Sequence, residues 1–420
     1  MVKAAFAISA TGADLYLLHA EMSQSRWQRI LERHDFDLLI YDEDRHSLTE
    51  HVPQIKNKLL SYHDTLPAVS NRLLANEGAA MTGMRRKRRA SSGKLVLLTG
   101  GTTGDGKEAA HQPSLFNYLD PFFAFVTRLN ILKCRSAYIA TPIYHGYGFA
   151  VLLLFFALGK KVVIRRGFDA EQACRLIREH RIEAVTVVPL MLRRMLAANP
   201  ADLGSLRCIA SGGAELNPQL AADTLKQLGP VLYNLYGTSE AGLCTIATPQ
   251  DLTRYPHTIG RKIWGSRLKI INERLEEAED GQVGQFCFRN RWSMRTGGRS
   301  WIETGDLGYR NEKGYYFLSG RTDSMIVSAG ENVYPLEVEQ VLLGHPQVED
   351  AAVIGIPDED FGQRLKAFIL PAPHAEIAEE ELLEWLRPRL ARYQMPKEIS
   401  VVNHLPYTSL GKLNKKELKR

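Results

Sequence analysis

The sequence predicts an α/β fold in which a large N-terminal domain precedes a small α+β C-terminal domain. Short apolar runs alternate with helical patterns up to about residue 255, which is typical of parallel strands joined by helices. Shorter strands separated by glycine turns follow, and they indicate an antiparallel sheet or a small barrel. From about residue 321, an amphipathic helix and a strand form a compact tail. We therefore expect two domains, residues 1–320 and 321–420.

Several apolar runs are the candidate buried strands of the large domain, and they span residues 37–42, 94–99, 136–141, 161–165, 184–189 and 206–213. Residues 169–180 carry a helical pattern that opens on Asp169, whose side chain suits a helix N-cap. The most apolar stretch, residues 149–159, is shorter than the ~20 residues that span a bilayer, so we expect a buried core helix. Later strands are expected within residues 281–290, 313–320 and 348–358, and the amphipathic helix within residues 335–346.

Composition and cysteine spacing indicate a globular protein of a reducing compartment. Apolar residues make up 45% of the chain and charged residues 24%. The five cysteines include no C-x-x-C pair, which argues against a disulfide framework or a zinc site and favours the cytoplasm. The apolar N-terminus is interrupted at Ser9, Thr11 and Asp14, so it does not read as a signal peptide.

The net charge of +6 arises in part from the run "RRKRR" at residues 85–89. This run reads as a solvated linker, and a patch for an anionic membrane surface or a polyanionic cosubstrate is the alternative. We expect at most a peripheral membrane contact. Because no basic stripe is interleaved with aromatic residues, we expect no nucleic-acid partner.

The loop "GTTGDGKE", residues 101–108, differs from the P-loop of nucleotide hydrolases at its last position. A P-loop needs a hydroxyl after the lysine and a helix that begins there, but Glu108 takes the hydroxyl position and Pro113 would interrupt the helix. Glycines, threonines and a lysine can still cradle phosphate through backbone amides, hydroxyls and a positive charge. A plain surface turn is the alternative. The residues of the predicted cradle are Thr99, Gly100, Gly101, Thr102, Thr103, Gly104 and Lys107.

Six further motifs follow the loop in order. They are "PIYHGYG" (142–148), "SGGAEL" (211–216), "NLYGTSE" (234–240), "TGDLG" (304–308), "GRTDSMIVSAGENVYPLEVE" (320–339) and "LPYTSLGKLNKKEL" (405–418). With the loop, they resemble the signatures of the adenylate-forming superfamily, which includes acyl-CoA synthetases, luciferases and peptide-synthetase adenylation domains. The resemblance implies stacked α/β sheets plus a small β-barrel in the large domain, and a small mobile α+β C-terminal domain.

The resemblance also implies a reaction in two steps that uses ATP, Mg²⁺ and coenzyme A. A carboxylate attacks the α-phosphorus of ATP and releases pyrophosphate, and a thiol then attacks the acyl-adenylate and releases AMP. Because the first step brings two anions together, cations and hydrogen-bond donors must offset their repulsion. By resemblance, Lys412 bridges the carboxylate and the α-phosphate, Glu240 binds Mg²⁺, and Ser239 supplies a phosphate-binding hydroxyl.

The remaining positions implied by the resemblance bind the nucleotide or serve the second step. Adenine contacts fall to Asn234 and Tyr236, in one motif with Gly237 and Thr238, and to the backbone of Gly213, Ala214 and Glu215. Asp306 and Arg321 correspond to the residues that hold the ribose hydroxyls. Asp323 lies at the hinge about which the C-terminal domain rotates in relatives. Gly330 lies beside the path of the CoA thiol, where a side chain would block it.

The sequence that follows residue 145 indicates the class of the substrate. It contains no acidic residue that could pair with an ammonium group, so an amino-acid substrate is not expected. His145, Tyr147 and the apolar helix suggest a fatty or aryl acid, although the same helix also reads as core. Because no fused carrier domain is evident, CoA is the favoured acceptor. Loading of a separate carrier protein, and a nucleotide-binding relative with impaired catalysis, stay open as alternatives.

Three features depart from the family pattern. The phosphate loop begins near residue 99, closer to the start than is usual, so the large domain reads as shortened at its N-terminus. An incomplete sheet would expose an edge and apolar surface, which makes a partner chain or an oligomer possible. Gly106 and Glu108 stand where proline and glycine are usual, and the segment before "TGD" is short.

Overall fold

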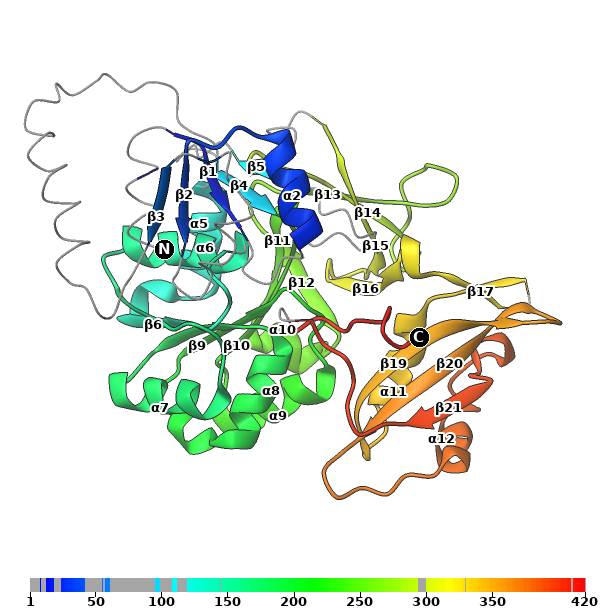
Figure 1. Ribbon diagram of the computed structural model, residues 1–420. Helices are drawn as coiled ribbons and strands as arrows, with labels where there is room; N and C mark the ends of the chain where they lie inside the picture. The colour runs from blue at the N-terminus through cyan, green and yellow to red at the C-terminus, as the bar shows by residue number, and fades with distance from the viewer. Residues whose placement is uncertain are drawn as a thin grey trace, which may run out of the picture. The chain divides into compact units, whose positions relative to one another are not determined.

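The computed structural model describes residues 8, 13–18, 24–41, 55, 57–60, 95–98, 108–111, 119–144, 146–293, 300–328, 330–408 and 411–419. The chain divides into two compact units, Met1–Leu115 and Phe116–Arg420 (Figure 1). The domain boundary expected between residues 320 and 321 falls inside the second unit and stays a prediction. In the described part of the chain, no helix is both long and apolar enough to cross a membrane.

The first unit contains short strands that include both runs expected there. Strand β2 (Leu38–Tyr41) pairs in parallel with β3 (Asn57–Leu60), and helix α2 (Gln24–Arg33) precedes them. Strand β4 (Leu95–Leu98) lies between β1 (Leu15–Leu17), which is parallel to it, and β5 (Glu108–His111), which is antiparallel. A strand therefore follows the lysine of the glycine-rich loop where a P-loop requires a helix, so the P-loop interpretation was rightly rejected.

The second unit is built on a sheet whose strand order is β13-β14-β15-β16-β12-β11-β10-β9-β8-β6-β7. Its parallel half contains β6 (Ser136–Ile139), β7 (Lys161–Ile164), β8 (Ala184–Val187), β9 (Cys208–Gly212) and β10 (Leu232–Thr238). Every residue of β6, β8 and β9 is buried, as expected for strands covered on both faces. The edge strand β7 has no buried residue.

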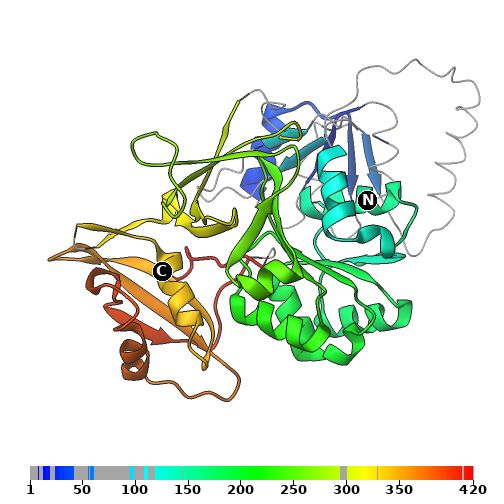
Figure 2. The same cartoon turned by 180° about the vertical axis from the view of Figure 1, so that it is seen from behind.

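Helix α5 (Leu119–Arg128) precedes these parallel strands, and four helices connect them. The connecting helices are α6 (Gly146–Ala157), α7 (Ala170–His180), α8 (Pro189–Ala198) and α9 (Pro218–Leu228). Both views show α7, α8 and α9 together on one side of the strands (Figures 1 and 2). Asp169 caps α7 as predicted, because its carboxylate accepts the backbone N–H of Gln172 at 2.9 Å. The predicted apolar core helix is α6, which buries six residues.

The antiparallel half of the sheet continues from β10. It contains β11 (Gly242–Ala247), β12 (Thr258–Lys262), β13 (Arg267–Ile271), β14 (Gly284–Arg289), β15 (Ile302–Arg310) and β16 (Tyr316–Arg321), with helix α10 (Pro249–Arg254) after β11. Phe286 and Phe288 are fully buried in its core. The antiparallel strands expected after residue 255 thus join the parallel strands in one sheet.

The C-terminal part of the second unit has its own sheet and core. Hairpin β17 (Ile326–Ser328) and β18 (Glu331–Val333) precedes α11 (Pro335–Leu343), and the sheet β19 (Val348–Asp358), β20 (Gly362–Pro371) and β21 (Glu398–Val401) follows with α12 (Glu379–Leu386). Val338 and Leu342 of α11 pack with residues of β19 and β20 in one buried cluster. The amphipathic helix and the strand predicted for the tail are therefore present.

Candidate active site

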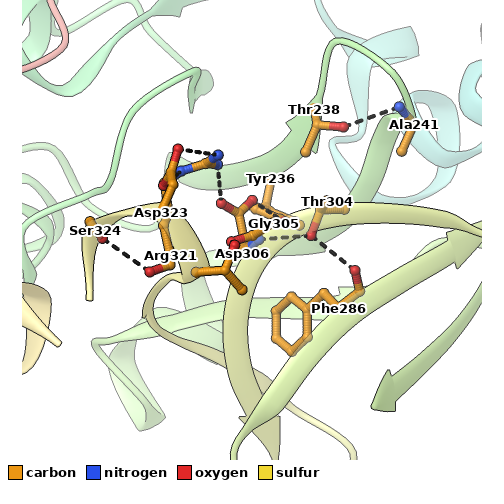
Figure 3. A network of polar contacts seen from close by, with 11 residues as sticks. Tyr236, Thr238, Ala241, Phe286, Thr304, Gly305, Asp306, Arg321, Asp323 and Ser324 are labelled. Carbon is orange, nitrogen blue, oxygen red and sulfur yellow. Dashed lines mark hydrogen bonds and ion pairs between the residues drawn. The ribbon is translucent and has the colours of Figure 1, made fainter. Parts of the chain in front are cut away.

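The hairpin between β10 and β11 carries the "NLYGTSE" motif to an exposed tip. Its register shifts between Tyr236 and Gly237, and the last pair is Thr238 with Gly242. A Cβ on Gly237 would lie 2.2 Å from the carbonyl oxygen of Gly242, so only glycine fits there. The Thr238 hydroxyl accepts the backbone N–H of Ala241 at 3.1 Å (Figure 3). Ser239 and Glu240 lie at this tip, Ser239 exposed and Glu240 half-buried.

Asn234 lies deeper in the same strand and serves the sheet. Its side-chain amide donates to the carbonyl oxygen of Thr258 at 3.2 Å, and the residue is 6% exposed. Asn234 is also the register partner of Ser211, at the end of β9. This position brings the "SGGAEL" loop beside the "NLYGTSE" strand, because the carboxyl ends of neighbouring parallel strands share one edge.

The "SGGAEL" loop turns sharply after β9. Gly213 has φ +83°, and an added Cβ would lie 3.7 Å from Val188 at the start of α8. Glu215 accepts a hydrogen bond from the side-chain amide of Gln340 in α11 at 2.9 Å. The side chain of Glu215 therefore contacts the C-terminal part, and its backbone stays the group that the resemblance assigns to the adenine contact.

A buried carboxylate joins three of the predicted site residues (Figure 3). The Tyr236 hydroxyl donates to Oδ2 of Asp306 at 2.6 Å, and Nη1 of Arg321 donates to Oδ1 of the same residue at 2.6 Å. Asp306 and Arg321 are register partners on β15 and β16. The Arg321 guanidinium also pairs with Asp323, the predicted hinge residue, at 2.9 Å.

Burial and these hydrogen-bond partners shift the pKa values of Asp306 and Arg321 in opposite directions. Desolvation raises the pKa of Asp306, and the hydrogen bond from Tyr236 and the charge of Arg321 oppose the rise. Desolvation and the neighbouring Asp306 raise the pKa of Tyr236 well above its ordinary value, so the phenol stays a hydrogen-bond donor. Desolvation disfavours the guanidinium of Arg321, but Asp323 and Asp306 outweigh it and raise its pKa.

Lys412 lies close enough to this network to interact with it electrostatically. Desolvation lowers the pKa of Lys412, while the charges of Asp306 and Glu240 act to raise it. A tight turn presents the lysine: its backbone N–H donates to the Thr408 hydroxyl at 3.2 Å, and its carbonyl accepts the Thr408 N–H at 2.8 Å. Gly411 has φ +68°, and a Cβ there would lie 2.7 Å from Val188. Glycine at this position therefore lets the turn lie directly against α8.

A second polar cluster holds the segment that precedes Lys412, and the motifs did not reveal it. Nη1 of Arg193 in α8 lies 3.0 Å from Oδ2 of Asp350 and 3.6 Å from Oε1 of Glu349. The Tyr407 hydroxyl donates to the same oxygen of Asp350. No local pattern in the sequence indicates this cluster. Arg193 and Asp350 are 157 positions apart, Tyr407 and Asp350 are 57 positions apart, and only Tyr407 belongs to a recognised motif.

Some predicted site residues are not described or are not brought into the cluster. His145 and the phosphate-cradle residues Thr99–Lys107 lie outside the described residues. Tyr147 is described, and its hydroxyl donates to the carbonyl oxygen of Ala210 at 2.7 Å. Gly330, in the turn between β17 and β18, has φ +82°, which favours glycine.

The donor chemistry fits a magnesium ion bound together with a nucleotide. Among the described residues, no group of three or more His, Cys, Asp or Glu side chains could enclose a metal by itself. Mg²⁺ is commonly held by one or two carboxylates, with waters and substrate phosphates as the other ligands. The half-buried carboxylate of Glu240 at the hairpin tip is compatible with that arrangement.

Comparisons with known proteins agree with this geometry. The family model described as AMP-binding enzyme matches residues 1–296, and the model described as AMP-binding enzyme C-terminal domain matches residues 337–412. The fatty acid–[acyl-carrier-protein] ligase ScoC of Streptomyces coeruleorubidus is 33% identical over 347 residues, which cover 77% of this chain and 66% of ScoC. A 2-succinylbenzoate–CoA ligase of Bacillus licheniformis is 30% identical over 342 residues, which cover 77% of this chain and 69% of the ligase.

A solved structure with the same fold is that of the amide bond synthetase McbA from Marinactinospora thermotolerans. It superposes with a TM-score of 0.84 at 25% identity and covers 98% of this chain and 85% of McbA. The chain thus spans about two thirds of the length of the curated relatives named above and more of the solved relative.

Proposed function

We propose that this chain, which belongs to the AMP-binding enzyme family, is an AMP-forming acid–CoA ligase. Family membership confirms the resemblance indicated by the motifs and the α/β architecture it implied. The proposed substrate is an apolar carboxylic acid, fatty or aryl, and the proposed cofactors are ATP, Mg²⁺ and CoA. The single observation that carries the proposal is the shared carboxylate of Asp306, which Tyr236 and Arg321 both contact at 2.6 Å and whose charge acts on Lys412.

In the first half-reaction, the chain would hold two anions in contact. The Lys412 ammonium would lie between the substrate carboxylate and the α-phosphate and offset their repulsion. Glu240 would hold Mg²⁺, which neutralises charge on the departing pyrophosphate, and Ser239 would donate its hydroxyl to a phosphate oxygen. The phosphate cradle with Lys107 is the proposed site for the β- and γ-phosphates.

The ribose and adenine would be held by groups that are already ordered. Each oxygen of Asp306 accepts one hydrogen bond from the protein and keeps a further acceptor position for a ribose hydroxyl. Arg321 fixes the orientation of that carboxylate. This pre-organisation supports the proposal, because a carboxylate held in place loses little entropy when the nucleotide binds.

The second half-reaction would use the C-terminal part differently. Asp323 is the proposed hinge, and it pairs at 2.9 Å with Arg321, which also contacts the carboxylate proposed for the ribose. Gly330 is proposed to leave room for the pantetheine thiol. Rotation about the hinge would withdraw Lys412 and bring the Gly330 turn to the acyl-adenylate.

A separate carrier protein is the second candidate acceptor, and the likeness to ScoC favours it, because ScoC is named as an acyl-carrier-protein ligase. A nucleotide-binding relative with impaired catalysis is less well supported, because Lys412, Glu240 and Asp306 supply the charged groups that the proposed reaction needs. All five cysteines are free and buried, which supports the proposed cytoplasmic location. The possible oligomer stays a prediction.

AMP release tests the proposal. The full chain is incubated with ATP, Mg²⁺ and a panel of fatty and aryl acids, with and without CoA, and thioesters are detected by mass spectrometry. We expect AMP and an acyl-CoA with at least one apolar acid. Adenylation without an acyl-CoA product would favour the carrier protein, and no AMP with any acid would refute the ligase.

A further inference from the structure

The two strands of the β10–β11 hairpin pair irregularly near its tip. Two glycines flank it, the register shifts inside it, and Gly242 has φ +70°. On the other side of β11, strand β12 pairs only at Thr245 and Ile246 among the described residues. Backbone carbonyls nearer the tip therefore need partners other than a neighbouring strand.

Two buried side chains that follow β14 supply those partners. The side-chain amide of Asn290 donates to the carbonyl oxygen of Ala241 at 2.9 Å. Nε1 of Trp292 donates to the carbonyl oxygen of Leu243 at 3.0 Å. Both residues are 3% exposed, so the two donor side chains are shielded from water. We call Asn290 and Trp292 the tip clamp.

Gly242, which lies between the two residues whose carbonyls are bonded, packs closely against the indole of Trp292. A Cβ on Gly242 would lie 2.7 Å from Cδ1 of Trp292, so a side chain at this position would displace the ring. The tip clamp thus contacts three consecutive residues, Ala241 to Leu243, by two hydrogen bonds and one close packing contact. These contacts restrict the backbone conformational freedom that two glycines would otherwise give the hairpin.

We propose that the tip clamp of Asn290 and Trp292 positions the carboxylate of Glu240 for binding the magnesium–nucleotide complex. Glu240 immediately precedes Ala241, the first clamped residue, so the Asn290 hydrogen bond restrains the backbone from which the Glu240 side chain extends. The inference rests on the proposed function, which gives Glu240 its metal. Asn290 and Trp292 are positioning residues, because they act through Glu240 and do not touch substrate themselves.

The decisive variant is Trp292→Phe, which keeps a ring against Gly242 but removes the Nε1 donor. Its matched control is Trp385→Phe, because Nε1 of Trp385 makes an equivalent bond to the carbonyl oxygen of Val341 at 3.0 Å, in the C-terminal part. Binding of a non-hydrolysable ATP analogue is measured by calorimetry across a range of MgCl₂ concentrations. Hydrogen exchange at the amides of residues 241–243 is measured in the same samples.

We expect Trp292→Phe to raise the Mg²⁺ concentration for half-maximal analogue binding about threefold to tenfold, in line with one lost buried hydrogen bond. Exchange at residues 241–243 should accelerate, while Trp385→Phe leaves both values at wild type. A Trp292→Phe variant that matches Trp385→Phe in both readouts would overturn the proposal. Neither readout needs turnover, so a failure of the ligase assay would leave this test intact.

Discussion

The Tyr236 hydroxyl donates a 2.6 Å hydrogen bond to Asp306, a residue 70 positions away in the sequence. This bond joins the "NLYGTSE" and "TGDLG" motifs, and Arg321 extends it to the start of the C-terminal part. Three segments that the sequence separates therefore share one carboxylate.

Removing the Tyr236 hydroxyl should weaken nucleotide binding as well as folding. We expect Tyr236→Phe to lower the free energy of unfolding by about 2 kcal/mol, because one buried hydrogen bond to a carboxylate is lost. The matched control is Tyr315→Phe, which removes a 2.8 Å bond to Asp251 and leaves the proposed site untouched. Denaturant unfolding should show a similar loss in both, and calorimetry should show weaker ATP binding in Tyr236→Phe alone. Equal ATP affinities would contradict the role of Asp306 in the ribose site.

Lys412 should serve only one of the two half-reactions. We expect Lys412→Ala to abolish adenylate formation, because the ammonium that offsets the two anions is gone. Thioester formation from a supplied acyl-adenylate and CoA should persist. Quench-flow measurements of each step separate the two effects, and equal loss of both steps would refute the assigned role.

The pKa of Lys412 should lie below its ordinary value. Desolvation lowers the pKa of Lys412, so its ammonium is disfavoured in the folded state relative to the unfolded chain. The contribution of this group to stability therefore rises with pH between the lowered pKa and 10.5. NMR titration after ¹³C reductive methylation should show a midpoint below 10.5, with the signal assigned by its absence in Lys412→Arg. Asp306→Asn should lower the midpoint further, and an unshifted midpoint would contradict the arrangement.

The Arg193 cluster should matter for adenylation more than for folding. Arg193→Ala removes the contacts with Asp350 and Glu349 that hold the chain leading to Lys412. We expect adenylate formation to fall about threefold to tenfold, in proportion to one lost charge-assisted hydrogen bond. Arg178→Ala is the matched control, because Arg178 of α7 forms a 3.0 Å ion pair with Asp202, away from the segment that leads to Lys412. A similar rate in both variants would show that the Arg193 cluster does not position Lys412.

Gly330 offers a test of the second half-reaction. Alanine at this φ of +82° should cost about 1–2 kcal/mol of stability through backbone strain alone. Gly314→Ala is the control, since Gly314 has φ +76° and, like Gly330, shows no atom within 4 Å of an added Cβ. We expect both variants to lose similar stability and only Gly330→Ala to slow thioester formation. Unchanged thioester formation in Gly330→Ala would remove Gly330 from the proposed thiol path.

Much of the fold follows from local patterns in the sequence. Continuous apolar runs such as residues 184–189 predicted buried parallel strands, and Asp169 marked the start of α7, because capping and burial are local signals. The meeting of Asp306, Arg321 and Tyr236 was expected only through the resemblance, since strand register decides it. The Arg193–Asp350 pair and the tip clamp could not be predicted, because they depend on side chains brought together by tertiary packing.

The most direct test of the central claim is acid-dependent exchange of labelled pyrophosphate into ATP by the full chain, since exchange reports the acyl-adenylate before any thiol is involved. We expect exchange that requires an apolar acid and Mg²⁺ and that Lys412→Ala abolishes. Exchange that persists unchanged in Lys412→Ala, or none with any acid in the folded wild-type protein, would contradict that claim.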